Sequence, residues 1–209
     1  MLSVKADFKE RFEESEVFLN HIKSGISNSS IRVQESSMLK SSYMLLLYNL
    51  IESTITSTLD EVHAKVSTVS YVDASNKVKR LIIDYHFGTS KKCNMRQLNE
   101  FLEGECKLPI YSEFSKKVRL YSGNLDAKEI DQLLTRYGIG KLTSQNKDKL
   151  LIVKNKRNKI AHGEVMFKEA CRHYSVQDLE KVTMAVFDAL NEVINMSESY
   201  LRHNRYKKS

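Results

Sequence analysis

The sequence predicts an all-α protein: an antiparallel bundle of long helices that carries a small, mostly helical insertion. Apolar residues recur every three or four positions over long segments, which is the spacing of one helix face. Helix breakers are scarce, with 1 proline and 7 glycines in 209 residues. Because long helices stand at both ends and in the middle, joined by short links, we expect a bundle formed by one domain, residues 1–209.

The first two helices are predicted at residues 4–23 and 35–66. The apolar face of the first consists of Val4, Phe8, Phe12, Leu19 and Ile22. A serine-rich stretch, SGISNSSI, follows and ends it. The second helix is apolar on nearly every side between Met44 and Ile51, so we expect it at the centre of the bundle. Its length would be about 45 Å.

The middle of the chain, about residues 88–140, reads as an insertion of short pieces beside the bundle. A helix at 72–86, ending near Gly88, leads into it, and a short helix at 94–103 ends at Gly104. Between 108 and 122 the pattern is weak. We expect KLPIYSEF to form a loop and KVRLYS a short strand.

Three further helices are predicted after this weak stretch. The first spans 125–137, with Asp126 or Asn124 as its N-cap and Gly138 at its end. The second spans about 145–159. The last begins at Ser175, where Ser175 and Asp178 form a variant of the capping box, and it continues to near the C-terminus.

The positive charge of the chain is concentrated in two places. The net charge is +7, and residues 141–159 hold seven basic residues against one acid, Asp148. The segment 202–209 adds four more basic residues and no acid. Concentrated positive charge suits a polyanion such as nucleic acid, although a solvated lysine face and a frayed C-terminus explain it equally well.

Several classes of protein find no support in the sequence. No stretch approaches the roughly 20 apolar residues of a membrane span, and the charged N-terminus does not resemble a signal peptide, so a cytoplasmic location is expected. Cys93, Cys106 and Cys171 lack metal-ligand spacing and are expected to be reduced thiols. We find no phosphate-binding loop and expect no metal and no cofactor.

One short segment, RNKIAHG at residues 157–163, offers both a structural and a chemical interpretation. In the structural one, Arg157 opposes the dipole at a helix C-terminus, His162 bonds the last carbonyl groups and Gly163 supplies a left-handed cap. In the chemical one, Arg157 and His162 face the same space at the helix end. Histidine transfers protons near neutral pH and arginine binds phosphate, with Asn158 placed to orient either side chain.

An imidazole and a guanidinium directed at one phosphate suit RNA cleavage without a metal ion. A base removes the proton of the 2′-hydroxyl, the 2′-oxygen attacks the phosphorus, and the cation stabilises the charged phosphorane. The leaving 5′-oxygen then needs an acid. Since one histidine cannot serve both ends at once, a symmetric homodimer that joins two copies of the segment would complete the site.

The segment resembles the motif of the HEPN superfamily, in which an arginine is followed by a polar residue and then by a histidine four to six residues after the arginine, at the start of the last helix of a four- or five-helix bundle. The central SSYMLLLYNLIESTI and, more loosely, residues 122–139 also resemble bacterial members. The N-terminal helix carries no family signal that we can assign. The resemblance implies a dimeric, metal-independent endoribonuclease of a toxin or anti-phage abortive-infection system.

Carried over by position, Arg157 and His162 match the catalytic pair and Asn158 matches the polar residue between them. Glu52 matches a polar helper on the central helix, although an ordinary exposed glutamate explains it as well. The nearby lysines would contact RNA: Lys154, Lys156 and Lys159.

Other histidines and the partner of the protein remain open at this point. We expect the remaining histidines at the surface or the edge of the core, with His173 a weaker candidate for a second proton carrier: His21, His63, His86, His173 and His203. The alternative function is a non-catalytic helical module that binds a partner, either nucleic acid or a protein such as an antitoxin or the product of an adjacent gene. The sequence does not specify the RNA target, the trigger or whether the dimer is homomeric.

Overall fold

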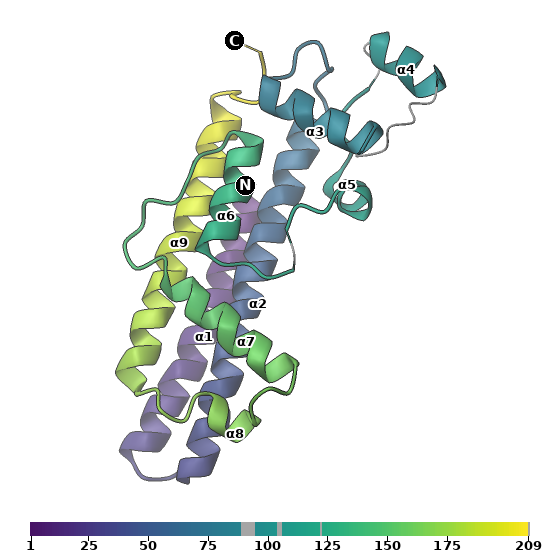
Figure 1. Cartoon of the computed structure of the whole chain (residues 1–209). Helices are drawn as coiled ribbons and strands as arrows, with labels where there is room; N and C mark the ends of the chain where they lie inside the picture. Colours follow the sequence, from purple (N-terminus) through teal and green to yellow (C-terminus); the bar gives the residue numbers. More distant parts are fainter. Residues whose placement is uncertain (89–94, 104–105, 122, 209) are drawn as a thin grey trace.

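The computed structural model describes residues 1–88, 95–103, 106–121 and 123–208, and there the chain is helical with no strand (Figure 1). The helices are α1 (Leu2–Ser27), α2 (Val33–Val66), α3 (Asn76–His86), α4 (Met95–Leu102), α5 (Tyr111–Lys117), α6 (Ala127–Tyr137), α7 (Lys149–Ala161), α8 (Phe167–Ala170) and α9 (Val176–Arg202). The predicted all-α class is therefore confirmed.

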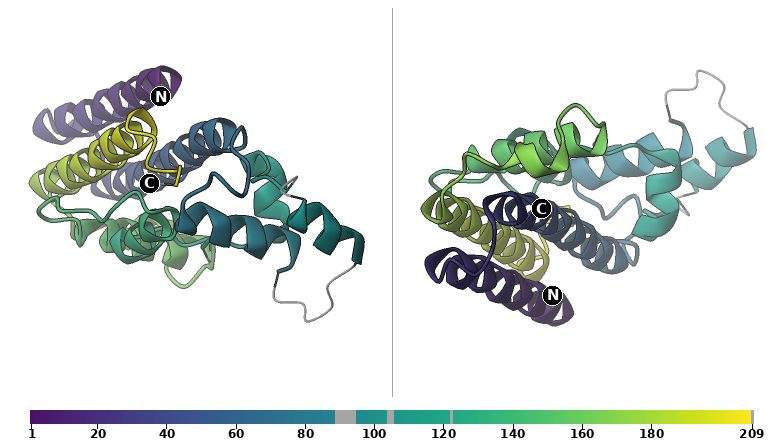
Figure 2. Two further views of the ribbon diagram at one scale, coloured as in Figure 1. Left: turned by 90° about the horizontal axis from the view of Figure 1, so that it is seen from above. Right: turned by 90° about the horizontal axis from the view of Figure 1, so that it is seen from below.

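Helix α2 lies at the centre of the bundle, as its apolar sequence predicts. It contacts α1, α7 and α9 along its length, and the views in Figure 2 show these helices side by side. With 34 residues it is about 51 Å long. Every residue of the apolar stretch Met44–Ile51 except Asn49 is at least partly shielded from solvent.

The helices of the bundle alternate in direction, with α1 and α7 running opposite to α2 and α9. Ion pairs join Lys5 to Glu198 at 2.9 Å and Lys23 to Glu180 at 2.8 Å, so opposite ends of α1 and α9 meet. Between these contacts, Phe12 packs on Phe187 with the ring centroids 4.5 Å apart. The predicted apolar residues of α1 are all buried, which fixes the face that α1 presents to the core.

Short helices lie at one end and to one side of the long ones, where Figure 2 shows α3, α4 and α5. Helix α3 begins four residues later than predicted because residues 71–74 form a turn and Ser75 supplies the N-cap, accepting the N–H of Val78 at 3.4 Å. Helix α4 lies within its predicted range, while the predicted first residue, Asn94, and Gly104 lie outside the described residues. The limits of the insertion, 88–140, remain a proposal.

The interpretation of residues 108–122 is wrong. YSEFSKK, whose first four residues were expected in a loop and whose last residue was expected to begin a strand, forms α5, and no described residue of KVRLYS is in a strand. The helix is stabilised by tertiary packing, because Tyr111 and Phe114 bury their rings against His63 of α2. Their ring centroids lie 5.3 and 4.9 Å from that of His63, respectively. A helix of 7 residues, about two turns, is too short for the apolar spacing to distinguish it from a loop.

Those contacts also correct the prediction for His63, which is fully buried rather than at the surface or the edge of the core. Its Nδ1 lies 2.8 Å from the carbonyl oxygen of Pro109 and its Nε2 lies 2.5 Å from the hydroxyl of Tyr137. Burial lowers the pKa of His63 to about 4, although the hydrogen bond to Pro109 opposes the shift. The imidazole is therefore neutral near pH 7 and joins α2, α5 and α6.

The predicted helix ends are confirmed at α6 and α9. Asp126 caps α6 by accepting the N–H of Glu129 at 3.0 Å, and Gly138 ends it with a φ of +79°. Ser175 and Asp178 form the capping box of α9. Helix α7 begins later than predicted, at Lys149. None of the described helices combines the length and the apolar character that crossing a membrane requires.

Candidate functional site

The segment RNKIAHG forms the C-terminal end of α7 and the turn that follows it. Arg157 lies in the last turns of the helix, and the backbone N–H of His162 donates to the carbonyl oxygen of Asn158 at 2.9 Å. Gly163 has a φ of +68° and supplies the left-handed turn that the structural interpretation predicts. The HEPN motif led us to expect this segment at the start of the last helix. It lies instead at the end of α7, and α8 with its flanking turns separates it from α9.

Arg157 lies against the central helix with its charge unneutralised. Its guanidinium is 4.6 Å from the ring centroid of Tyr48, and its Nη1 donates to Oδ1 of Asn158 at 3.0 Å. Among the described residues no carboxylate forms an ion pair with it. The side chain is half-buried, so aromatic stacking and the Asn158 amide position it while its charge remains available for an anion.

Tyr48 forms the platform beneath Arg157 and is fixed by its hydroxyl. The hydroxyl donates to the carbonyl oxygen of Gly123 at 3.0 Å and accepts the N–H of Leu125 at 3.2 Å. Burial raises the pKa of Tyr48 to about 12, with the charge of Glu52 adding to the shift and that of Arg157 opposing it. The structure thus brings Arg157, Asn158, Tyr48 and Glu52 together.

Tyr48 lies in the apolar stretch Met44–Ile51 that was expected at the centre of the bundle, and it is buried there, but its role as a platform was not predicted. No sequence pattern identifies the contact, because Tyr48 and Arg157 lie on helices far apart along the chain. Glu52, one helical turn after Tyr48, is partly exposed next to the same platform.

His162 is exposed at the end of α7. Within the described residues neither a hydrogen bond of its ring nor a ring contact joins it to Arg157 or to another side chain. Its imidazole is therefore open to a ligand or to a second protein copy. His173, the other candidate proton carrier, is also exposed.

The three lysines expected to contact RNA have different environments. Lys154 donates to Oδ2 of Asp126 at 2.5 Å and is only 18% exposed. Lys156 donates to the carbonyl oxygen of Ala170 at 2.7 Å and so attaches α7 to α8. Lys159 is exposed, and no partner of its ammonium group is found in the described part of the chain. Of the three, Lys159 is the one that the structure leaves open to an anion.

The Asp126 carboxylate shows why Lys154 is not open in the same way. Burial by itself would raise the pKa of Asp126, but the hydrogen bonds from Lys154 and from the backbone N–H groups at the start of α6 outweigh it and hold this pKa below its usual value. The carboxylate stays ionised at neutral pH, so the charge of Lys154 is neutralised within the fold.

Helix α8, which the sequence did not predict, lies beside the end of α7. The hydroxyl of Ser41 on α2 donates to the carbonyl oxygen of Phe167 at 2.7 Å, and Ser37 bonds that of Lys168. Together with Lys156, these bonds hold the turn after His162 against the first half of α2. Two methionines of this region are exposed: Met38 by 44% and Met166 by 63%.

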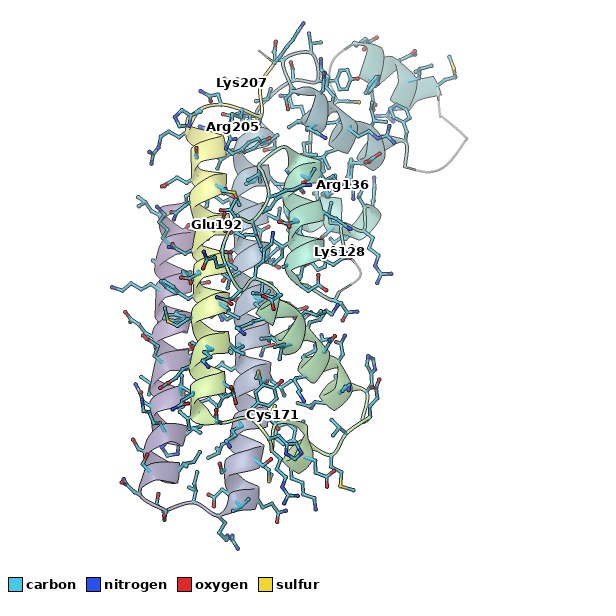
Figure 3. All side chains as sticks on the ribbon, turned by 60° about the vertical axis from the view of Figure 1, so that its left-hand side comes forward. Lys128, Arg136, Cys171, Glu192, Arg205 and Lys207 are labelled. Atoms are coloured by element: carbon cyan, nitrogen blue, oxygen red, sulfur yellow. The ribbon has the colours of Figure 1, made fainter. Side chains whose placement is uncertain are left out.

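Other candidate sites lie apart from this cluster. A groove of about 870 Å³ runs along α6 and the start of α7, lined by Lys128, Arg136 and Lys141 among others, and Figure 3 labels the first two. Among the described residues no three histidine, cysteine or acidic side chains gather as metal ligands would. Cys106 and Cys171 are buried, and Cys93 lies outside the described residues.

The bundle and the arginine–histidine segment together define a HEPN-type helical protein. The sequence matches the family described as HEPN_MAE_28990-like HEPN over residues 3–206, and the chain belongs to this family. The match includes α1, a helix in which we could assign no family signal from the residues alone. A comparison with curated proteins found no match, and neither did one with solved structures.

Proposed function

We propose that the protein is a metal-independent endoribonuclease that cleaves RNA by attack of the 2′-hydroxyl. One observation carries the proposal: Arg157 is held on Tyr48 with no carboxylate partner in the described residues, on the helix whose C-terminal end presents the exposed His162. A positioned cation and a free imidazole at one helix end are the groups that this reaction requires. Membership of a HEPN family supports the same assignment.

The proposed reaction uses two histidines and transfers one proton at each end. One His162 accepts the proton of the 2′-hydroxyl while the 2′-oxygen forms a bond to phosphorus. Arg157 stabilises the negative charge of the phosphorane, and the bond to the 5′-oxygen then breaks. The His162 of a second copy donates a proton to that oxygen. The products carry a 2′,3′-cyclic phosphate and a 5′-hydroxyl.

We propose a homodimer that brings two such helix ends together. The region around α8 supports it, because Met38 and Met166 expose apolar side chains next to the turn that follows His162. A twofold contact there would place both copies of the segment near the axis. Asn158 would keep the guanidinium oriented, Glu52 would act as a polar helper beside it, and Lys159 would contact RNA with its exposed ammonium group.

We further propose that this activity serves as a toxin or an anti-phage effector in the cytoplasm, restrained by a partner such as an antitoxin or the product of an adjacent gene. The competing hypothesis, a non-catalytic module, makes Arg157 and His162 parts of a helix end only. Their replacement would then cost stability, about 0.5–2 kcal/mol for a lost cap, without removing an activity.

The test compares RNA cleavage in EDTA by the wild type, by His162→Ala and by His21→Ala. His21 is an exposed histidine on α1 and serves as the matched control. We expect cleavage by the wild type and by His21→Ala, and a loss of at least about a hundredfold in His162→Ala because general acid–base catalysis contributes this much or more. Thermal unfolding of the three proteins should agree within a few degrees.

Cleavage at full rate by His162→Ala would overturn the proposal. No cleavage by any of the three proteins, alone or with the product of an adjacent gene, would favour the non-catalytic module.

A further inference from the structure

A polar hollow of about 720 Å³ lies at the end of the bundle that is remote from α8. It is formed by the end of α2, the turn that follows it and the C-terminal segment after α9. Four lysines line it: Lys65, Lys107, Lys207 and Lys208. Figure 3 labels Lys207 at this end and Cys171, which follows α8, near the other.

The C-terminal segment is fixed in place by its backbone. The N–H of Ser75 donates to the carbonyl oxygen of Tyr206 at 2.8 Å, and the N–H of Lys208 donates to that of Asp73 at 2.7 Å. The ring of Tyr206 is buried, with 2% of the residue exposed. The segment is therefore not a frayed end, and Lys207 and Lys208 project from an ordered backbone.

The hollow carries an excess of positive charge that the fold does not neutralise. Its lining contains four lysines and one acidic residue, Asp73. None of the four lysines forms an ion pair among the described residues. The Asp73 carboxylate accepts a hydrogen bond from Ser70 at 2.7 Å. By contrast, Lys147 and Lys154 near α7 are paired with aspartates.

The other polar side chains of the lining mainly bond within the fold. The hydroxyl of Thr68 donates to the carbonyl oxygen of Lys65 at 2.8 Å, and the amide oxygen of Asn204 accepts from the hydroxyl of Tyr206 at 2.8 Å. The ammonium groups are therefore the part of the lining that suits a ligand, and unpaired ammonium groups suit the phosphate groups of a polyanion, because each lysine that binds a phosphate displaces a counterion.

The hollow is too remote from Arg157 to share one phosphate with it. Lys65 follows Tyr48, the platform of Arg157, by 17 residues on α2, which places the two about 26 Å apart along the helix. A strand with many phosphates can occupy both places, whereas a dinucleotide cannot.

We propose that this hollow is an anchor for the phosphate backbone of an RNA strand, remote from the reacting bond. The inference rests on the proposed function, which supplies RNA as the substrate. It adds a second binding site to the molecule and predicts that long RNA binds more tightly than short RNA for a reason separate from catalysis.

The experiment measures binding of a fluorescent single-stranded RNA of about 30 nucleotides by anisotropy, in EDTA and in the His162→Ala background. One variant carries Lys65→Gln, Lys207→Gln and Lys208→Gln. The matched control carries Lys77→Gln, Lys128→Gln and Lys141→Gln, three exposed lysines of the α6 groove, and so has the same net charge.

We expect the hollow variant to raise the Kd by at least about tenfold and to reduce the slope of log K against log salt by about 2, since three phosphate contacts are lost from a single strand. The control should change the Kd by less than about threefold. Competition by inorganic phosphate should be weak, because one phosphate engages only part of the cluster. A Kd equal to that of the parent, an equal effect of both variants, or no RNA binding by the parent would overturn the inference.

The two proposals fail in different ways. In the catalytically intact protein, the hollow variant should cleave a dinucleotide at the parent's rate and long RNA with a raised KM. RNA binding that depends on the hollow without any cleavage would remove the proposed activity and keep the anchor. Cleavage of long RNA with an unchanged KM would keep the activity and remove the anchor.

Discussion

Arg157 and Lys154 are three residues apart on the same helix, yet within the described part of the chain only the charge of Lys154 is neutralised by an ion pair. The Lys154 ammonium pairs with Asp126 at 2.5 Å, whereas the Arg157 guanidinium rests on an aromatic ring. A lysine in an ion pair supports structure, while a stacked arginine without a carboxylate keeps its charge, and the donors that Asn158 does not occupy, for a ligand. This difference, which charge counting cannot reveal, is why we assign Arg157 to the site.

A second prediction at the residue scale concerns His63 and the pH dependence of stability. The pKa of His63 is about 4 in the folded chain, whereas its ordinary value is 6.5. Above pH 6.5 the imidazole is neutral in both states and the full stability is present. As the pH falls from 6.5 to 4, the unfolded chain binds the proton first, so the free energy of unfolding decreases. Between about pH 7.5 and about pH 5 we expect a loss of about 2 kcal/mol in urea titrations.

The control for this prediction is a pair of variants. His63→Gln should remove most of the pH dependence between those two conditions, while His21→Gln, on the exposed face of α1, should keep it. A His63→Gln protein with the same pH dependence as the wild type would show that burial of this imidazole is not its origin.

At the scale of elements, Asp126 joins two helices, since it caps α6 and pairs with Lys154 of α7. Asp126→Ala removes both interactions and should lower the free energy of unfolding at pH 7 by about 2 kcal/mol. Asp126→Asn keeps a capping acceptor and should cost about half as much. Because the folded pKa of Asp126 lies below its ordinary value, this stabilisation is present above pH 3.8 and is lost as the pH falls further.

Chemical denaturation of the two variants side by side checks the prediction. Equal losses in Asp126→Ala and Asp126→Asn would mean that the cap contributes nothing and that the ion pair alone matters.

The sequence predicts elements well where local signals decide them. The long helices α1, α2 and α9 follow from apolar spacing, and the caps at Asp126, Gly138 and Ser175 follow from turn chemistry. Helix α5 was missed because its stability comes from packing against His63, a residue far away in sequence. Short helices such as α8 likewise depend on hydrogen bonds from α2.

The same contrast between local signals and distant contacts explains why only part of the candidate site was predicted. Arg157, Asn158 and His162 share one segment and can be found together in the sequence. The Tyr48 platform and the pairing of Lys154 with Asp126 depend on contacts between distant helices, which a single sequence does not reveal.

At the scale of the whole molecule, the mechanism requires two copies. We predict that the wild type is a dimer by sedimentation equilibrium, and that Met38→Glu with Met166→Glu converts it to a monomer because the charges would be buried in the contact. The matched control is Met184→Glu, a methionine on α9 that is 53% exposed, which should remain dimeric. A monomeric wild type, or a double variant that stays dimeric, would contradict the proposal that this surface forms the dimer contact.

The chemistry of the cleaved ends tests the central claim most directly. A labelled RNA incubated with the wild-type protein in EDTA should yield fragments with 2′,3′-cyclic phosphate and 5′-hydroxyl ends, because the 2′-oxygen is the nucleophile. Fragments with 5′-phosphate ends, or cleavage that stops when EDTA is added, would show that water or a metal-bound hydroxide attacks instead, and the account built on Arg157 and His162 would be wrong.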